Sequence, residues 1–383
     1  MPAKAIEQKW KEIVSGSRND RFARFARGTL SAASKLFGIA VRSRTKLYEH
    51  GIFKRSWPGC VVISIGNITV GGTGKTPVTE TFARALTAGG RKVAIVSRGY
   101  KAKSPSLKWR RKHKQLYPTT LVVHDGKNLL LGARVSGDEP YMLARNLENV
   151  IVIVDHDRVR GSRYAISHFG VDTILLDDGM QHIRLQRQID VVLIDATCPF
   201  GFDKLLPAGL LREPLSGLRR ATHIIITKSK NVDINPIKAV IRKYNDKAEI
   251  MSCYYEPVSL VNLHTGECVP IETIKDNNVF VMTGIAQPEG FITLLKENGA
   301  TVQRVYTYPD HHRFRRDEIE HVYRRAANWH TDAVIITEKD SVRFSKKAGL
   351  RVRNCPIYYL KIEIKIQSGE KKFSDCIMNI CYP

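Results

Sequence analysis

The chain has 383 residues, with 43% hydrophobic and 26% charged residues, which is enough for two or more domains with ordinary cores and excludes widespread disorder. The formal net charge of +24 favours a polyanionic partner, namely a nucleic acid, an anionic membrane or a phosphorylated substrate. Charge alone does not choose among these three.

Residues 1–55 form a basic first region, with thirteen Lys or Arg against four Asp or Glu. Apolar side chains recur in steps of mostly three and four between Phe22 and Val41, and basic residues interleave with them, which predicts an amphipathic helix. Such a helix suits the headgroup region of an anionic membrane. The alternative is a helix that packs on the protein and leaves its basic face in solvent.

Residues 56–230 read as an α/β core, because short apolar, β-branched runs alternate with helical stretches. Such runs predict a largely parallel sheet flanked by helices. Strands are expected at 60–65, 91–96, 120–123, 150–154, 173–176, 191–194 and 224–226, and a helix at 77–88. The basic stretch 101–114 is either a solvated loop or one that faces phosphates or headgroups.

Residues 231–383 are predicted to contain connector strands, a second, smaller α/β domain and a C-terminal tail. Its strands are expected at 279–282, 301–305, 333–336 and 357–364. The seven cysteines show no C-x-x-C pair and indicate reduced thiols in a cytosolic protein. No run reaches the roughly 18 apolar residues of a membrane span, and the charged N-terminus does not resemble a secretory signal.

The clearest chemical signal is Ile65-Gly-Asn-Ile-Thr-Val-Gly-Gly-Thr-Gly-Lys-Thr-Pro77, a strand followed by a glycine-rich turn and a helix. Glycines let backbone amides approach phosphate oxygens, and a helix N-terminus favours anions. The strict phosphate-loop pattern fails because position 69 is Thr, so an ordinary strand-turn-helix is the alternative. The predicted phosphate-binding residues are Gly71, Gly72, Thr73, Gly74, Lys75 and Thr76.

Two acidic motifs could complete a nucleotide site. Asp177 and Asp178 end an apolar strand, where a carboxylate commonly holds the Mg²⁺ of a phosphate-loop enzyme, and Asp178 is preferred for that role. His182, four residues on, is either near the metal or structural. Gly137-Asp-Glu-Pro140 opens a helix, so its acids are either helix caps or a base and a metal ligand.

A histidine motif, Tyr308-Pro-Asp-His-His-Arg-Phe314, lies in the second domain. It contains either a catalytic histidine or only the loop before a helix. Three further motifs are Ser97-Arg-Gly-Tyr100, Pro207-Ala-Gly-Leu-Leu-Arg-Glu-Pro214 and Thr337-Glu-Lys-Asp340.

Together and in this order, these motifs resemble the tetraacyldisaccharide 4'-kinase family, the lipid A kinases of Gram-negative bacteria. The resemblance covers the chain to about residue 345. Met180 departs from it, since the family usually has an aromatic residue there, and the stretch 101–114 and the tail beyond about 350 match no motif.

The resemblance implies a phosphate-loop kinase that uses ATP and Mg²⁺. Its acceptor would be the 4'-hydroxyl of a tetraacylated glucosamine disaccharide 1-phosphate in lipid A biosynthesis. It implies phosphate contacts by Lys75 and Arg212, and Asp138 as the catalytic base. It implies metal ligation by Thr76, Glu139 and Asp178. It places the catalytic histidine at His311, with His312 as the neighbouring alternative, and so predicts a site that forms where two domains meet.

The resemblance also implies a peripheral enzyme at the cytoplasmic face of the inner membrane, held there by its N-terminal helix. Two other functions compete with this interpretation. A switch or partitioning ATPase would share the phosphate loop and the Asp-Asp strand. A nucleic-acid-binding ATPase would explain the positive charge. However, no nucleic-acid-binding module is recognisable in the sequence, and a nucleic acid is not expected as a partner.

Overall fold

The computed structural model describes residues 2–99, 119–344 and 355–382. The chain divides into two compact units. Unit 1 comprises Met1–Tyr254 and Ile364–Pro383, and unit 2 comprises Tyr255–Glu363. Within the described part, no helix is long and apolar enough to cross a membrane.

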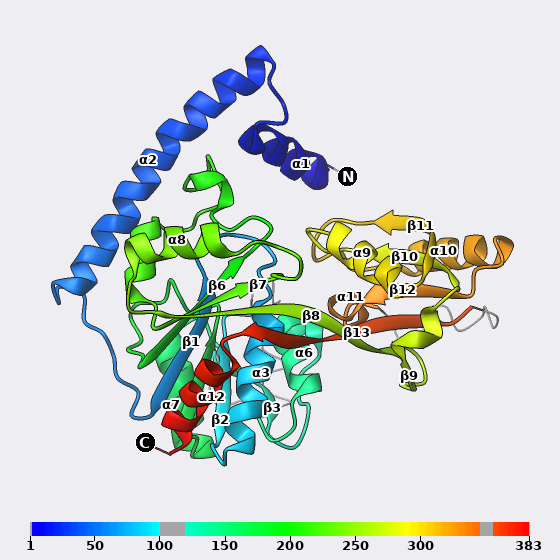
Figure 1. Ribbon diagram of the computed structural model, residues 1–383. Coiled ribbons are helices and arrows are strands. Elements are labelled where there is room, and N and C mark those ends of the chain that lie inside the picture. Colours follow the sequence, from blue (N-terminus) through cyan, green and yellow to red (C-terminus); the bar gives the residue numbers. More distant parts are fainter. Residues whose placement is uncertain (1, 100–118, 345–354, 383) are drawn as a thin grey trace. The chain divides into compact units, whose positions relative to one another are not determined.

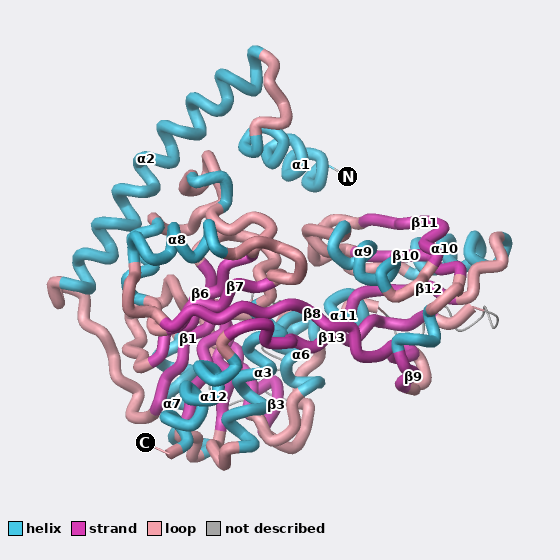
Figure 2. The backbone as a smooth tube through the Cα atoms, viewed as in Figure 1, coloured by secondary structure: helices cyan, strands magenta, loops and turns pink. Residues whose placement is uncertain are grey.

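Unit 1 is built on a sheet in the strand order β8-β7-β6-β1-β5-β2-β4-β3 (Figures 1 and 2). The pairs are parallel except for β3 against β4, which confirms the largely parallel sheet. The strands are β1 (Val61–Asn67), β2 (Val93–Ser97), β3 (Leu121–Asp125), β4 (Ile151–Val154), β5 (Thr173–Asp177), β6 (Ile189–Asp195), β7 (His223–Thr227) and β8 (Glu249–Asn262).

Helices cover both faces of this sheet, because alternate residues of each buried strand point to opposite sides. Ile63 of β1 packs in one cluster with α3 and α6, whereas its neighbour Val62 packs in another with α7. The helices are α3 (Lys75–Ala88), α5 (Ala133–Ser136), α6 (Asp138–Asn146), α7 (Arg158–Phe169), α8 (Asn235–Tyr244) and α12 (Glu370–Cys381). Short 3-10 turns lie at Gly201–Asp203 and Leu215–Arg220.

The C-terminal segment differs from the expected domain division. The segment 364–383 belongs to unit 1, where α12 packs on α3 and the rings of Phe82 and Phe373 meet edge to face at 5.1 Å. Residues 231–254 also belong to unit 1, because β8 continues its sheet beside β7. The sequence could not show this, since the apolar face of α12 does not reveal which unit it covers.

Unit 2 has parallel strands in the order β11-β10-β12-β13. They are β10 (Asn278–Thr283), β11 (Thr301–Thr307), β12 (Ala333–Thr337) and β13 (Ile357–Ser368), and β9 (Cys268–Pro270) pairs with β8. The helices are α9 (Glu289–Glu297), α10 (Arg316–Asn328) and α11 (Glu338–Ser341), with a 3-10 turn at Ile271–Ile274. The expected second α/β domain is therefore present.

The N-terminal region forms α1 (Pro2–Ser15) and the long α2 (Arg21–Glu49), as the periodicity predicted. Asp20 caps α2 by accepting a hydrogen bond from the Ala23 amide at 2.8 Å. The middle of α2 rests on the core, where the Ser34 hydroxyl donates to the Leu205 carbonyl at 2.9 Å. Gly38 lies against the same leucine, so α2 approaches the core closely there.

Candidate functional site

The phosphate loop connects the central strand β1 to α3. Gly71 and Gly74 adopt φ values of +124° and +82°, which residues other than glycine rarely adopt. The turn therefore requires the glycines that the motif has at these two positions. Lys75 begins α3, and its Nζ lies 3.3 Å from Asn67 Oδ1 and 3.6 Å from Asp178 Oδ1. The predicted lysine and acidic strand therefore meet.

Asp177 is buried at the end of β5, beside β1 in the parallel sheet. Its Oδ2 accepts a hydrogen bond from Ser97 Oγ at 2.9 Å, and its Oδ1 has no hydrogen-bond partner among the described residues. Burial, together with the charges of Glu139 and Asp178, raises the pKa of Asp177 to about 6. The structure thus contains a buried carboxylate oxygen that a cation would stabilise.

Asp178 follows β5 in a left-handed conformation, with φ +53°. Its Oδ1 lies 2.6 Å from Arg212 Nη1, in addition to the lysine contact. Burial acts to raise the pKa of Asp178, but Lys75 and Arg212 outweigh burial and lower it. Asp178 therefore stays ionised and available to a metal or to a phosphate-bound cation.

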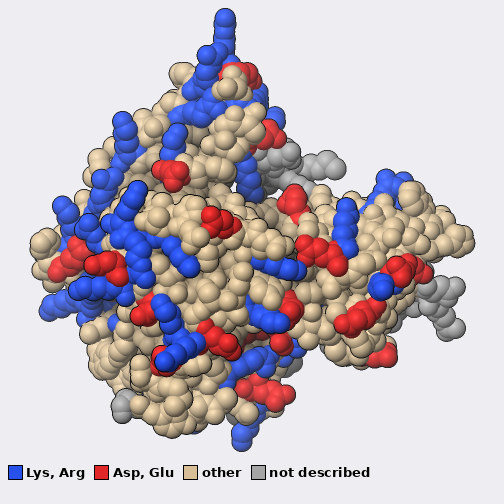
Figure 3. Space-filling view, viewed as in Figure 1, with Lys and Arg blue, Asp and Glu red and all other residues tan. Residues whose placement is uncertain are grey.

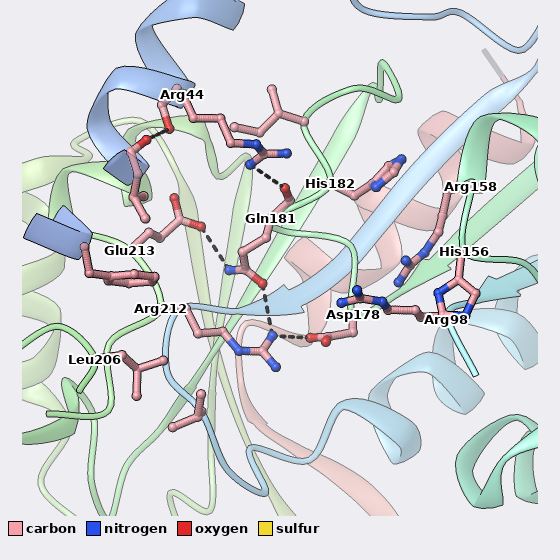
Figure 4. Close-up of a pocket in the computed structure, with 15 residues that line it drawn as sticks. Arg44, Arg98, His156, Arg158, Asp178, Gln181, His182, Leu206, Arg212 and Glu213 are labelled. Carbon is pink, nitrogen blue, oxygen red and sulfur yellow. Dashed lines mark hydrogen bonds and ion pairs between the residues drawn. The ribbon is translucent and has the colours of Figure 1, made fainter. Parts of the chain in front are cut away.

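Arg212 is held by a chain of side chains (Figure 4). Its Nη1 donates to Gln181 Oε1 at 3.0 Å, and Gln181 Nε2 donates to Glu213 Oε1 at 3.0 Å. Glu213 accepts in turn from Arg220 Nη2 at 2.5 Å. The Leu-Arg-Glu-Pro motif and the Asp-Asp-Gly-Met-Gln motif therefore interlock.

Asp138 and Glu139 form the first turn of α6, directly after Gly137, whose φ is +92°. Asp138 is buried, and the charge of Glu139 acts on Asp177. Glu139 thus lies near the acidic end of β5, and Asp138 precedes it in the same helical turn.

This donor set fits Mg²⁺. Among the residues that the structure describes, no three His, Cys, Asp or Glu side chains form a complete metal cage. Mg²⁺ usually takes only one or two carboxylates and completes its shell with substrate phosphates and water. Asp178, Glu139 and the Thr76 hydroxyl would supply protein ligands, and the unpaired Oδ1 of Asp177 lies in the same acidic cluster.

A cavity of about 520 Å³ opens beside this cluster (Figure 4). Phe37 and Val41 of α2 contribute apolar surface to its lining. Most of the other lining residues are polar or basic. Its remaining lining residues are Arg44, Thr45, Val70, Arg98, His156, Arg158, Asp178, Gln181, His182, Ile183, Leu206, Arg212 and Glu213.

Several cavity residues were not predicted individually. His156 and Arg158 follow β4 at the same carboxyl edge, and the polar run directly after an apolar strand was the available signal. Arg44 was visible only as one of the many basic residues of α2. His182 lines the cavity, and burial together with Arg158 lowers its pKa to about 4, so it is a neutral imidazole near pH 7.

In unit 2, His311 and His312 lie in the loop between β11 and α10. His312 Nε2 lies 2.8 Å from Glu318 Oε2, and its ring stacks on Tyr308 at 4.8 Å, which is a structural setting. His311 has φ +62°, and its Nδ1 lies 3.2 Å from Arg343 Nη2.

The comparisons with known proteins agree with this geometry. The family model for the tetraacyldisaccharide-1-P 4'-kinases (LpxK) matches residues 26–382. The chain belongs to this family. A tetraacyldisaccharide 4'-kinase of Halothermothrix orenii is 34% identical over 371 residues, which cover 93% of this chain and 93% of the relative. One of Anaeromyxobacter dehalogenans is 37% identical over 331 residues, covering 85% and 84%.

A solved structure is also similar. The crystal structure of LpxK from Aquifex aeolicus in complex with ATP superposes with a TM-score of 0.73 at 29% sequence identity. The match covers 93% of this chain and all of that one. The predicted family and fold class are confirmed, and the roles of individual residues stay predictions.

Proposed function

We propose that this chain transfers the γ-phosphate of ATP to the 4'-hydroxyl of a tetraacylated glucosamine disaccharide 1-phosphate, a step of lipid A biosynthesis. One observation carries the proposal: Asp178 and Arg212 belong both to the Lys75 cluster and to the wall of the 520 Å³ cavity. A nucleotide on the phosphate loop and an acceptor in the cavity would therefore share these two side chains.

The donor half of the reaction uses the phosphate loop. Backbone amides of Gly71–Thr76 and the N-terminus of α3 bind the phosphates, and Lys75 offsets charge on the γ-phosphoryl group. Thr76, Glu139 and Asp178 would hold Mg²⁺, which would supply positive charge to the phosphates of the nucleotide. Arg212 is placed to stabilise the negative charge of the transferred group.

The acceptor half needs one proton to move. Asp138 accepts the proton of the 4'-hydroxyl, whose oxygen forms a bond to the γ-phosphorus while the bond from that phosphorus to the β–γ bridging oxygen breaks. ADP leaves with that electron pair. His311 is the proposed catalytic histidine, and His312 has the structural role that its Glu318 contact supports.

The cavity suits an amphiphilic, anionic acceptor. Arg44, Arg98 and Arg158 can bind a sugar 1-phosphate by charge-assisted hydrogen bonds. Phe37 and Val41 offer an apolar surface to the beginning of an acyl chain. The neutral His182 can donate or accept a hydrogen bond without adding charge.

Helix α2, which contributes Phe37 and Val41 to the cavity, also exposes apolar side chains to solvent. Phe22, Phe25, Leu36 and Ile39 recur on one face of α2, with exposed fractions of 62%, 73%, 70% and 58%. Lys and Arg side chains flank this face, and Figure 3 shows many of them over the N-terminal helices. We infer that α2 lies in the cytoplasmic leaflet of the inner membrane and leads the lipid-borne sugar to the cavity.

The test is the transfer of labelled γ-phosphate to tetraacyldisaccharide 1-phosphate in detergent micelles. The intact chain should label the lipid. Asp138→Ala and Lys75→Ala should each lose about 10²-fold or more in rate, whereas Lys127→Ala, which removes an exposed lysine, should retain full activity. Phosphate released to water with none on the lipid would instead support a switch ATPase.

A further inference from the structure

The contact between Arg343 and His311 determines the protonation pattern of the histidine ring. Arg343 Nη2 lies 3.2 Å from His311 Nδ1. A guanidinium has five N–H donors and no acceptor, so Nδ1 must be the acceptor in this hydrogen bond. A ring nitrogen that accepts carries no proton, and the proton of the neutral ring therefore lies on Nε2.

Arg343 is held in place by buried partners. Its Nη1 donates to Asp340 Oδ1 at 3.0 Å and to the Gly284 carbonyl at 2.9 Å. The side chains of Arg343 and Asp340 are both fully buried. Asp340 also accepts from Thr283 Oγ1 at 2.8 Å, from Thr337 Oγ1 at 2.7 Å and from the Gly284 amide at 3.1 Å. The guanidinium consequently has one geometry, with its second nitrogen directed at the imidazole.

The backbone of His311 is held by Gly284, the same residue whose carbonyl binds Arg343. Its amide lies 3.3 Å from the Gly284 carbonyl and 2.9 Å from Asp310 Oδ1. The Oδ2 of Asp310 lies 3.7 Å from His311 Nε2, which places a negative charge beside the nitrogen that carries the proton. The backbone of Gly284 thus contacts both Arg343 and His311. A Cβ atom at position 284 would lie 3.1 Å from the Pro309 carbonyl oxygen, which is a tight contact.

We propose that Arg343, held by Asp340, is a positioning residue that keeps His311 in the Nε2–H tautomer. This proposal rests on the proposed function only in assigning His311 to the phosphoryl transfer. In that tautomer His311 donates a hydrogen bond through Nε2 and cannot take up a proton there. His311 can therefore donate through Nε2 to an acceptor such as a carboxylate or phosphate oxygen, and it cannot act as a base at that nitrogen.

The tautomer can be read directly from the wild-type protein. Long-range ¹H–¹⁵N spectra of the full chain labelled with ¹⁵N-histidine distinguish a protonated from an unprotonated ring nitrogen. The His311 signals are identified by their loss in His311→Gln. A protonated Nε2 and an unprotonated Nδ1 are expected, and the reverse pattern would overturn the proposal without any arginine variant.

Substitution of the arginine then tests the cause. Arg343→Met should redistribute the His311 signals between tautomers and lower kcat by about tenfold or more, with KM for ATP unchanged. Arg343→Lys, which keeps a cation beside Asp340, should retain the fold and restore part of the tautomer bias. Arg316→Met, which removes an arginine with a side chain 64% exposed on α10, is the matched control and should alter neither readout.

Two results would refute the assignment. An unchanged tautomer in both Arg343 variants would show that the arginine does not set it. A fall in kcat without any change in the His311 signals would reduce Arg343 to a purely structural residue. Full kinase activity in His311→Gln would instead remove His311 from the proposed mechanism, while the wild-type spectrum would still decide the tautomer.

Discussion

Asp177 should destabilise the ligand-free protein at neutral pH, and its replacement should reveal this. The pKa of its carboxyl is raised from an ordinary value of 3.8 to about 6, first by burial and then by Glu139 and Asp178. That difference corresponds to about 3 kcal/mol of unfolding free energy at pH 7. Asp177→Asn removes the charge with little change of shape and should increase stability by up to that amount.

The sign of the pH dependence follows from proton binding. Between pH 3.8 and about 6 the folded chain holds a proton on Asp177 that the unfolded chain releases, so the wild-type protein loses stability as pH rises through this window. The advantage of Asp177→Asn should therefore be small near pH 3.5 and complete above pH 7. Urea denaturation with a chelator at several pH values measures it.

Asp190→Asn provides the matched contrast. Asp190 is equally buried and burial raises its pKa as well, but its Oδ2 pairs with Arg187 Nη2 at 3.0 Å. Loss of the carboxylate charge leaves the buried guanidinium with its hydrogen bonds to the Gly179 and Met180 carbonyls but without its ion-pair partner, and should cost about 3–5 kcal/mol. If Asp177→Asn destabilises the protein at pH 7.5, or if its effect does not vary with pH, the argument from the unpaired buried carboxylate is refuted.

Three further outcomes follow from the structure. Lys75→Met should abolish lipid phosphorylation and also lower the urea midpoint at neutral pH, because Asp178 loses one of the two cations that keep its carboxylate ionised; an unchanged or higher midpoint would contradict this. The double substitution Phe25→Ser and Leu36→Ser should weaken co-sedimentation with anionic liposomes several-fold, without affecting phosphoryl transfer to a short-chain acceptor in solution. Unchanged sedimentation would show that this face of α2 does not bind the membrane. Gly66→Ala should destabilise the fold by about 1–3 kcal/mol, because a Cβ would lie 2.5 Å from the buried Met180 amide, and a neutral effect in thermal unfolding would show that β1 can move away.

The parts of the site that sequence could predict are local. The phosphate loop depends on glycines next to Lys75, and the hydrophobic run before Asp177 predicts the strand that ends there. Because β1 and β5 are adjacent and parallel, their carboxyl ends meet at one edge, so Lys75 and Asp178 come within 3.6 Å. The continuous apolar runs likewise predicted most strands of both units, whereas β8 and β9 were expected at most as part of a connector with short strands.

What sequence could not predict depends on distant contacts. Arg343 lies 32 residues after His311, and although it follows the Thr337-Glu-Lys-Asp340 motif, nothing in the sequence links it to the histidine. The closeness of α2 to the core depends on Gly38 meeting Leu205, two residues without a shared pattern. The choice between a membrane-bound helix and a helix packed on the protein was open for the same reason; α2 in fact packs on the core, lines the cavity with one face and exposes another.

The acceptor cavity and the phosphate loop are mechanically connected. Arg220, Glu213, Gln181, Arg212 and Asp178 form one hydrogen-bonded chain, and Glu213 within it is only 3% exposed. Because each side chain fixes the next, displacement of Gln181 at the cavity wall must move Arg212 or break its bond of 3.0 Å. In the proposed mechanism, an acceptor that contacts this wall would align Arg212 with the transferred phosphoryl group, and water alone cannot supply the same contacts. This coupling gives a physical reason for phosphate to be transferred to the lipid rather than lost to hydrolysis.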